Sequence, residues 1–315
     1  MDLVIRNVRM IDGTGADTVP NVSVEVADGR ISWIGEETAR PRRTVHQQDI
    51  DAQGLTLIPG MIDCHEHFTG DGGWESMHGL LNDSQDVFTL KAVGNCRRAL
   101  MSGVTSARDV GARFGINILI AQQTASGEVL GPRIIAAGEW LQFSGCWPAG
   151  LTRRTETTEE LLIAIQEQID RGAGLIKVGA TGFAPDGTQF SNIGPQALVA
   201  AVRASHAAGL KIAAHCHGFE GSRDAVEAGI DSVEHGTYVD EPTVRIMAEK
   251  GTYMVPTMST WDVRERLALQ MRQSREQMAD ILDRKDNSIA SFKRALEAGV
   301  TIATGTDAGG SPARH

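Results

Sequence analysis

The chain has 315 residues, which at roughly 150 residues per domain allows about two domains, or one large barrel with an attachment. With 30 Lys and Arg against 40 Asp and Glu, its formal charge is −10, so binding of nucleic acid is not expected. The composition, 41% hydrophobic and 22% charged, is that of a globular protein and excludes a largely disordered chain.

Signals for export or membrane insertion are not found in the sequence. The first ten residues, MDLVIRNVRM, contain no basic segment followed by an apolar run, and no apolar stretch reaches the roughly 18 residues that span a bilayer. The four cysteines form no CxxC pair, and we expect free thiols rather than a disulfide. These features predict a cytoplasmic protein.

Residues 1–58 differ from the rest of the chain in the pattern of their apolar and β-branched residues. They contain short, partly alternating β-branched runs such as VSVEVADGRISWIG, which are interrupted by Gly, Asp and Asn. This pattern predicts a small antiparallel sheet that forms a separate N-terminal β-domain. In residues 59–315, apolar runs alternate with segments of helical length, which predicts a second and larger domain.

The second domain contains eight short apolar runs with the composition of strands buried on both faces of a parallel sheet. In chain order, these predicted strands are 61–65, 104–110, 133–138, 175–180, 211–216, 232–236, 252–258 and 301–307. Several intervening segments end on a glycine just before the next strand. Thr157–Glu160 predicts a helix N-terminus, and one long helix is predicted over 262–299.

The alternation predicts an α/β fold, namely a (β/α)₈ TIM-like barrel with the small N-terminal β-sheet domain attached. A doubly wound open sheet is the alternative. No GxGxxG motif opens a helix after the first strand, and eight successive units favour closure. The chain stops eight residues after the last predicted strand, so we expect the barrel to lack its last helix.

Histidines gather at the ends of the predicted strands, where a barrel of this kind carries its active site. The first strand ends in His65-Glu66-His67. Because successive strand residues point to opposite faces, His65 and His67 share a face and Glu66 points away. Two imidazoles side by side on one strand form half of a metal site.

Three further strand ends and one buried position extend this pattern. His215, His235 and Asp307 end the fifth, sixth and eighth strands, and Lys177 lies within the fourth. Imidazole and carboxylate ligands suit Zn²⁺ or a similar divalent ion with one position open for water. One such histidine is ordinarily a hydrogen-bonded core or rim residue, but the combined pattern favours a metal site. Lys177 alone is weak evidence, although an ammonium would be repelled by metal ions.

The sequence resembles a known family in seven successive motifs. These are PGMIDCHEH, GVTSARDVG, GPRIIAAG, IKVGATG, AAHCHG, SVEHGTYVD and ATGTDAGG. They are similar to the motifs of the metal-dependent amidohydrolase superfamily, and most similar to its prolidase-like and imidazolonepropionase-like members. The resemblance extends from the N-terminal sheet to the last residue.

The resemblance implies two divalent metal ions, with Zn²⁺ expected. It also implies a role for six polar residues of the motifs. The implied ligands are His65, His67 and Asp307 for the first metal, His215 and His235 for the second, and a CO₂-derived carboxylate on Lys177 as the bridge. The implied reaction is hydrolysis of an amide C–N bond in a small-molecule substrate. A metal-bridging hydroxide would attack the carbonyl carbon, and Asp307 would carry the proton to the leaving nitrogen.

Other polar residues near the strand ends are predicted to contact the substrate or to support the structure. His217 shares a face with His215 and is predicted either to polarise the substrate carbonyl as a catalytic residue or to pack against the rim. Tyr238, on the loop after the sixth strand, is a candidate substrate contact. Arg108 and Asp109 are expected to form a structural ion pair with each other rather than to act in catalysis.

The sequence departs from the family at two places. Prolidase-like members often carry Gly-Gly-His after the third strand, where this chain has Ser144-Gly145-Cys146-Trp147-Pro148. Trp147 therefore predicts contact with a bulkier or more apolar substrate than a dipeptide. The early end would leave barrel and sheet surfaces exposed, which predicts poor stability as a monomer unless another chain, as in a homo-oligomer, covers them.

Two alternative functions remain open at this point. One is a mononuclear deaminase or imidazolone-type ring hydrolase, which Lys177 disfavours. The other is a non-catalytic binding scaffold or inactive truncated fragment, which the presence of all six candidate ligands disfavours. The substrate, the metal, and the choice between amide, ester and lactone are not determined by the sequence.

Overall fold

The computed structural model describes residues 3–40, 48–73, 79, 81–144, 152–184, 188–311 and 313–315. The chain divides into two compact units, Met1–Gly60 and Met61–His315, and each is described by itself. Within the described ranges, no helix combines the length and the apolar character needed to cross a membrane.

The first unit is a five-stranded sheet. Its elements are β1 (Leu3–Met10), β2 (Val19–Ala27), β3 (Arg30–Glu36), the 3-10 helix η1 (Glu37–Ala39), β4 (Gln48–Asp51) and β5 (Thr56–Leu57). The strand order is β3-β2-β1-β4, and β5 also pairs with β1. The prediction of an antiparallel sheet is wrong in part, because β4 and β5 pair with β1 in parallel. Local patterning predicts strands but does not determine how a returning chain pairs with the first strand.

Local chemistry explains the hairpin of this unit. Asp28 and Gly29 have positive φ values of 50° and 72° and connect β2 to β3, as a two-residue turn between twisted strands requires. One face of the sheet buries a small cluster that consists of Val8, Val22, Val24 and Ala52.

The second unit alternates strands and helices. Its strands are β6 (Met61–Glu66), β7 (Val104–Asp109), β8 (Arg133–Ala136), β9 (Trp140–Phe143), β10 (Arg153–Thr155), β11 (Leu175–Gly179), β12 (Thr181–Phe183), β13 (Gln189–Ser191), β14 (Lys211–Cys216), β15 (Ser232–His235) and β16 (Tyr253–Val255). Its helices are α2 (Gln85–Met101), η2 (Arg113–Gly115), α3 (Ile116–Ser126), α4 (Thr158–Asp170), α5 (Pro195–Ala207), α6 (Phe219–Ala228), α7 (Glu241–Lys250), α8 (Ser259–Gln270) and α9 (Arg275–Glu297).

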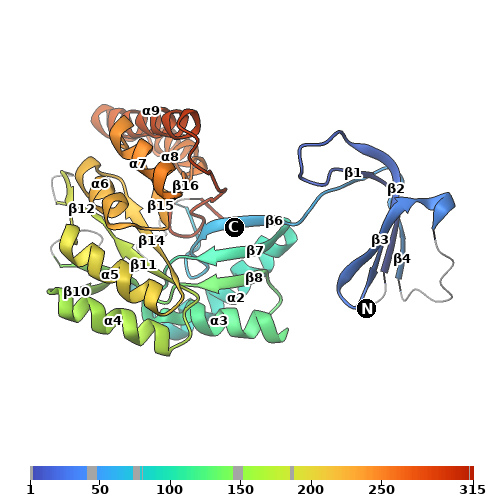
Figure 1. Cartoon of the computed structure of the whole chain (residues 1–315), viewed down its shortest axis with the longest axis horizontal. Helices are drawn as coiled ribbons and strands as arrows, with labels where there is room; N and C mark the ends of the chain where they lie inside the picture. Colours follow the sequence, from blue (N-terminus) through green and yellow to red (C-terminus); the bar gives the residue numbers. More distant parts are fainter. Residues whose placement is uncertain are drawn as a thin grey trace. The chain divides into compact units, whose positions relative to one another are not determined.

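Two parallel sheets form the centre of this unit. One has the order β10-β9-β11-β14-β15-β16 and the other the order β6-β7-β8, while β12 and β13 form a separate hairpin. In Figure 1, helices α4, α5 and α6 lie along the outer side of β11 and β14. The largest core cluster fills the space between this sheet and its helices and includes Leu141, Leu161, Ile165, Ile176, Leu198 and Ile212.

The helix ends follow from local sequence. The Thr157 side chain accepts a hydrogen bond from the Glu160 amide at the start of α4, which confirms the predicted N-terminus. The prediction of one helix over 262–299 is wrong, because α8 ends at Gln270 and α9 begins after Ser274. Ser274 and Gln277 form a reciprocal capping box, which satisfies backbone groups that a continuous helix would pair internally.

The predicted eighth strand, 301–307, is not a continuous strand. It contributes only isolated bridges, Met254 to Ile302 on one side and Glu66 to Ala308 on the other. Its backbone nevertheless bonds to both neighbouring strands, since the Cys64 amide donates to the Thr304 carbonyl (2.8 Å) and the Met254 amide to the Thr301 carbonyl (3.0 Å). The fold is thus mixed α/β with two parallel sheets and this connecting segment, and the fully closed barrel stays a prediction.

Candidate metal centre

The structure brings the predicted ligands together at the ends of the parallel strands. His65 and His67 come from the end of β6, His215 and His235 from β14 and β15, and Asp307 from the segment that follows Thr306. Two sets of residues have ligand atoms that all lie within 4.8 Å of one another. One set is His65, His235 and Asp307, and the other, which includes His217 from the end of β14, is His215, His217 and His235. We refer to His65, His67 and Asp307 as the Asp307 group, and to His215, His217 and His235 as the triple-histidine group.

The Asp307 group has the spacing of a coordination shell. The Nε2 atoms of His65 and His67 each lie 3.5 Å from the same Asp307 Oδ1. Ligand atoms bound tetrahedrally at zinc distances of about 2.1 Å are about 3.4 Å apart. Both distances to Asp307 match this spacing, so either histidine could share a divalent ion with Asp307.

Hydrogen bonds fix which nitrogen of each histidine faces this point. His65 Nδ1 donates to Glu234 Oε2 (2.7 Å), and His67 Nδ1 donates to the Gly111 carbonyl (2.7 Å). Since these partners accept hydrogen bonds, each Nδ1 carries the proton and each Nε2 keeps a lone pair for a metal. Burial lowers the pKa of His65 to about 3 and that of His67 to about 4, so both rings are neutral at pH 7.

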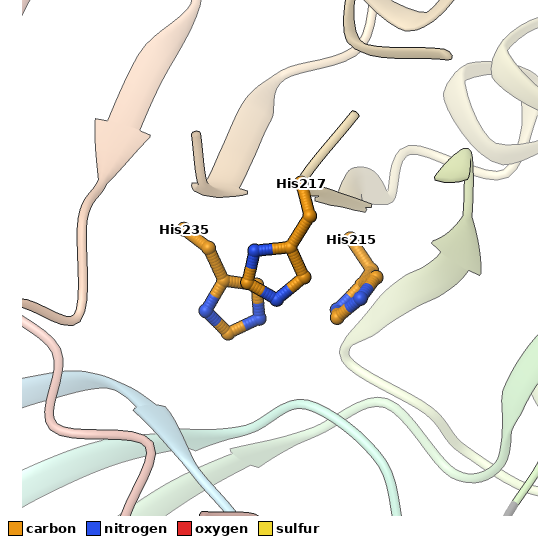
Figure 2. Close-up of side chains that lie close together, drawn as sticks. All are labelled: His215, His217 and His235. Atoms are coloured by element: carbon orange, nitrogen blue, oxygen red, sulfur yellow. The ribbon is translucent and has the colours of Figure 1, made fainter. Parts of the chain in front are cut away.

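The triple-histidine group is assembled by two strands, and Figure 2 shows its three rings side by side. The His217 and His235 rings are stacked, with centroids 4.6 Å apart. Their Nδ1 atoms hydrogen-bond to hydroxyls, His217 to Thr237 and His235 to Thr257. Burial is the main cause of a pKa well below the ordinary value for all three histidines, so they too are neutral.

The two groups adjoin each other through His65 and His235, whose ring centroids are 4.7 Å apart. The backbone is unusual at this junction, because His235 and Asp307 have φ values of 69° and 56°. A residue with a side chain rarely adopts this left-handed conformation, which costs on the order of 1–3 kcal/mol. The surrounding hydrogen bonds hold this conformation, for example the bond from the Asp307 amide to the His65 carbonyl (2.7 Å).

Lys177 lies in the same region on β11. Its side chain is only 1% exposed, and its Nζ has no hydrogen-bond partner in the part of the chain that the structure describes. The amine lies 5.7 Å from the centroid of the Trp140 ring, and that ring packs against His215. Burial lowers the pKa of Lys177 to about 8, which increases the fraction of neutral amine near neutral pH.

Asp307 is the carboxylate that the two parts of the centre share. It is 7% exposed, and burial raises its pKa to about 7, although the positive charges of Arg264 and Lys177 act in the opposite direction. A carboxyl group with this pKa can take up and release a proton near neutral pH. Gly310 permits its approach to His67, because a Cβ at position 310 would lie 2.2 Å from His67 Cδ2 and 2.5 Å from Asp307 Oδ1.

Glu234 is a supporting residue that the sequence analysis did not single out. It is fully buried, and its second oxygen accepts hydrogen bonds from Arg108 Nη2 (2.7 Å) and Ser232 Oγ (2.6 Å). Burial acts to raise the pKa of Glu234, but Arg108 and the His65 hydrogen bond outweigh it and hold the pKa well below its ordinary value. The carboxylate is therefore charged and orients His65.

The predicted ion pair between Arg108 and Asp109 is wrong. Consecutive strand residues point to opposite faces, so Arg108 pairs with Glu234. Asp109 instead accepts hydrogen bonds from the Phe68 and Gly111 amides and from Asn117.

The two candidate substrate contacts have different outcomes. The Tyr238 amide donates to the His217 carbonyl (3.1 Å), which brings its backbone to the centre, but its hydroxyl donates to Asp283 of α9 (2.6 Å). Trp147 lies outside the described residues. Cys64, Cys96 and Cys216 are free thiols, as predicted.

Known proteins share this architecture. Residues 56–314 match the Amidohydrolase family. The chain belongs to the amidohydrolase family. This assignment confirms the resemblance seen in the motifs, and the family relation supports a hydrolase that acts on amide or other C–N bonds.

Three members of the amidohydrolase family illustrate the similarity. The ochratoxinase of Aspergillus niger is 29% identical over 333 residues, which cover 95% of this chain and 67% of that protein, and its crystal structure has a TM-score of 0.83. A crystal structure of a Xaa-Pro dipeptidase with bound methionine in the active site is 27% identical with a TM-score of 0.86, covering 98% of this chain and 80% of that one. The imidazolonepropionase of Acidiphilium cryptum is 27% identical, over 81% of this chain and 69% of that protein.

The residues of this amidohydrolase fit the metal ions that the family generally uses. The donor set is imidazole nitrogen and carboxylate oxygen, which suits zinc and similar divalent ions. The Nε2 atoms of His65 and His67 are left without a proton by the hydrogen bonds at Nδ1, so each offers a lone pair that a metal ion could bind. The buried Nζ of Lys177 has no hydrogen-bond partner among the described residues.

Proposed function

We propose that this chain is a binuclear metal-dependent hydrolase that cleaves an amide C–N bond in a small peptide-like or cyclic substrate. The proposal rests mainly on one observation, the approach of His65 Nε2 and His67 Nε2 to the same oxygen of Asp307 beside the triple-histidine group. Both Nδ1 atoms already donate to other acceptors, so both Nε2 lone pairs face the Asp307 carboxyl group, and a metal ion would complete this arrangement. A further part of the proposal is that the two sheets and the segment 301–308 form one closed barrel.

In this proposal, the chain's own residues hold the metal ions and move the proton. His65, His67 and Asp307 hold the first ion, and His215 and His235 hold the second. The ligand types suit Zn²⁺ and Mn²⁺ alike, and either ion would lower the pKa of a bound water and polarise the substrate carbonyl. Asp307 accepts the proton from the attacking water and donates it to the leaving nitrogen.

Lys177 would join the two ions as a carboxylated side chain. The neutral amine is the form that adds CO₂, and addition with loss of one proton converts the side chain into a carboxylate. The lowered pKa, the complete burial and the unpartnered Nζ of Lys177 support this role. His217 would then either polarise the substrate carbonyl or serve as a further ligand of the second ion, since it lies within the triple-histidine group.

One alternative is favoured by a specific observation. The similarity to an imidazolonepropionase supports a ring hydrolase as the alternative, and in this alternative the site would hold a single metal ion. In such a site, Lys177 would carry no carboxylate and its burial would serve no catalytic purpose. The number of bound metal ions separates this alternative from the binuclear proposal.

The deciding experiment is elemental metal analysis of the purified protein grown with added zinc and bicarbonate. We expect about two ions per chain, and about one in the Lys177→Met variant, which keeps the length of the side chain but cannot be carboxylated. The same preparations are then assayed for amine release from a panel of dipeptides and N-acyl amino acids.

The outcomes distinguish the binuclear proposal from the mononuclear alternative. One ion in the unchanged protein, and the same number in Lys177→Met, would replace the binuclear proposal with the mononuclear one. A protein that binds no metal in either form would contradict both. A control variant, Lys211→Met, removes an exposed lysine that pairs with Asp231 and should leave the metal content unchanged.

A further inference from the structure

Two side chains of β9 carry buried hydrogen-bond donors without an acceptor. Trp140 Nε1 and Gln142 Nε2 have no hydrogen-bond partner among the described residues. Both residues are more than nine-tenths buried, since Trp140 is 8% exposed and Gln142 is 1% exposed. Buried donors are almost always hydrogen-bonded in folded proteins, so two exceptions on neighbouring positions of one strand face call for an explanation.

The two donors point toward the same place. Residues two apart on a strand share a face, and Trp140 is paired in register with Lys177 of β11. A Cβ atom placed on Gly179 of β11 would lie 3.0 Å from Trp140 Nε1 and 3.0 Å from Gln142 Oε1. Both side chains therefore converge over Gly179, where β11 has no side chain of its own. We refer to Trp140 and Gln142 as the β9 donor pair.

The β9 donor pair lies beside the triple-histidine group. The Trp140 ring packs against the His215 ring, with centroids 4.6 Å apart. Gly179 is paired in register with His215 on the neighbouring strand β14. The donors thus lie next to the histidine that, in the proposed function, holds the second metal ion. This is where the carbonyl group of a substrate would be polarised.

The chemistry of the pair limits what it can bind. The indole N–H and the carboxamide NH₂ are donors, and neither group carries a charge. Apart from Lys177, which the proposed function converts into a carboxylate, β9 and β11 have no charged side chain. The donors are therefore not a site for a permanent anion. Neutral donors that are fixed in a buried site before the reaction are suited to an oxygen that becomes negatively charged only during the reaction.

We propose that Trp140 Nε1 and Gln142 Nε2 donate hydrogen bonds to the carbonyl oxygen of the scissile amide as it becomes an oxyanion. After Asp307 has accepted a proton from the attacking water, the water oxygen bonds to the carbonyl carbon. The π electron pair of the carbonyl then moves onto its oxygen, which accepts both hydrogen bonds. When the C–N bond breaks, this pair forms the double bond again. The nitrogen leaves with the C–N pair and takes the proton from Asp307, which gives a carboxylic acid and an amine.

This inference rests on the proposed function and adds two catalytic residues to it. Kinetics on the most active amide of the substrate panel test their role. Gln142→Met keeps the length of the side chain and Trp140→Phe keeps a ring against His215, while each removes one donor. Loss of one such donor should lower kcat about 10²-fold. KM should change less than threefold, because the hydrogen bonds strengthen only when the oxygen becomes charged.

Binding of two isosteres gives a readout that does not depend on turnover. In the phosphinate isostere of leucylglycine, a tetrahedral phosphorus with two oxygens replaces the scissile carbonyl carbon, and in the ketomethylene isostere the carbonyl stays planar and neutral. The metal-loaded protein should bind the phosphinate at least tenfold more tightly than the ketone. In Gln142→Met and Trp140→Phe, the phosphinate affinity should fall at least tenfold, and the ketone affinity should change less than threefold.

Thermal unfolding of the metal-free protein separates this role from a structural one. Because the amide of Gln142 has no partner for its donor, Gln142→Met should not lower the unfolding midpoint. Gln168→Met is the matched control, since it removes a buried amide that is hydrogen-bonded to Glu139. The control should lower the unfolding midpoint and leave kcat within threefold. Metal content is measured for each variant, so that a loss of metal is recognised directly.

Three results would overturn the inference while leaving the proposed function intact. The first is a rise in KM with kcat unchanged in both variants, which would assign the pair to binding of the ground state. The second is a fall in kcat that matches an equal loss of bound metal. The third is a phosphinate affinity that does not exceed that of the ketone or is unchanged in both variants, and this result decides if no substrate is cleaved. Failure of the proposed function would appear separately, as absence of bound metal in the unchanged protein.

Discussion

The two halves of the candidate metal centre are supported in different ways. In the Asp307 group, the histidine Nδ1 atoms donate to a buried carboxylate and to a backbone carbonyl. In the triple-histidine group, the supporting partners of His217 and His235 are threonine hydroxyls. Hydrogen bonds to charged groups are roughly twice as strong as neutral ones, so the bond from His65 to Glu234 gives the first half its firmer support, whereas the bond from His67 is neutral like those of the second half. The comparison teaches that two halves of one centre can differ in the strength of the hydrogen bonds behind their histidines. We call the Asp307 group the firm half and the triple-histidine group the adaptable half.

This difference suits the chemistry that we propose for each half. The Asp307 group would hold a metal ion throughout the reaction, and Asp307 must keep its geometry while it moves a proton. In the triple-histidine group, His217 lies against the Phe183 and Trp261 rings, and a substrate would bind and leave on this side in the proposed function. Weaker support on that side would permit small movements of the rings during substrate exchange.

The largest expected effect follows from changing Asp307 itself. Asp307→Asn keeps the shape of the side chain but cannot accept the proton or supply a charged ligand. We expect kcat to fall about 10³-fold, in the range of a lost acid–base residue. Steady-state kinetics on the most active amide substrate would measure it. Asp240→Asn, which alters a helix N-cap outside the centre, is the control, and comparable losses in both variants would contradict the role of Asp307.

The second prediction concerns the hydrogen bond that supports His65 in the firm half. Glu234→Gln removes the charge that orients His65 and leaves Arg108 without its carboxylate. Loss of such a supporting partner typically lowers metal affinity 10- to 100-fold. The metal affinity would be measured by titrating the metal-free protein with Zn²⁺ in competition with a chelator. The loss should appear in one of the two binding steps. An unchanged affinity in both steps would show that Glu234 only stabilises the fold.

The third prediction concerns acid and applies to both halves. The metal-free protein should lose stability as pH falls from about 6.5 toward 5, because the unfolded histidines bind protons that the folded ones do not. Each such histidine contributes up to ~1.4 kcal/mol per pH unit within this window. Three buried carboxyl groups with raised pKa, Glu66, Asp109 and Asp307, act in the opposite direction. They are outnumbered by six histidines with lowered pKa, namely the five of the centre, His65, His67, His215, His217 and His235, together with His315.

Denaturant titrations at several pH values in the presence of a chelator would measure this slope. His67→Gln and His217→Gln each remove one of the five histidines, one from each half, and each should reduce the slope. A free energy of unfolding that stays constant between pH 6.5 and 5 would contradict the prediction.

The smallest effect is expected in the adaptable half. Thr257→Val keeps the shape of the side chain and removes only the hydroxyl that bonds to His235 Nδ1. A neutral hydrogen bond contributes about 1 kcal/mol, so metal affinity should fall only a few-fold. If Thr257→Val weakened metal binding as much as Glu234→Gln, the two halves would be equally supported and the comparison would be wrong.

Several features could be predicted from the sequence because they depend on local spacing. The period of two along a strand placed His65 and His67 on one face, and the structure brings both Nε2 atoms to Asp307. Short apolar runs separated by segments of helical length predicted parallel strands with helices between them. Helix starts such as Thr157 were also predictable, because a cap involves residues only a few positions apart.

Other features depend on contacts between distant segments. Glu234 gave no signal of its own, since it lies beside His235 in a strand and the period of two would point it elsewhere. Because His235 has a positive φ, the alternation fails there, and both residues contact the His65 ring. The partner of Arg108 was mispredicted for a related reason, because a sequence neighbour was chosen over a residue 126 positions away.

By itself, the sequence determined the types of the ligand residues, their order along the chain and the family to which the chain belongs. These depend on local periodicity and on motifs. The tertiary structure alone decided which nitrogen of His65, His67, His217 and His235 is free, and which carboxylate supports His65. These depend on distances between side chains from different strands and helices, which only the packing of the whole unit brings together.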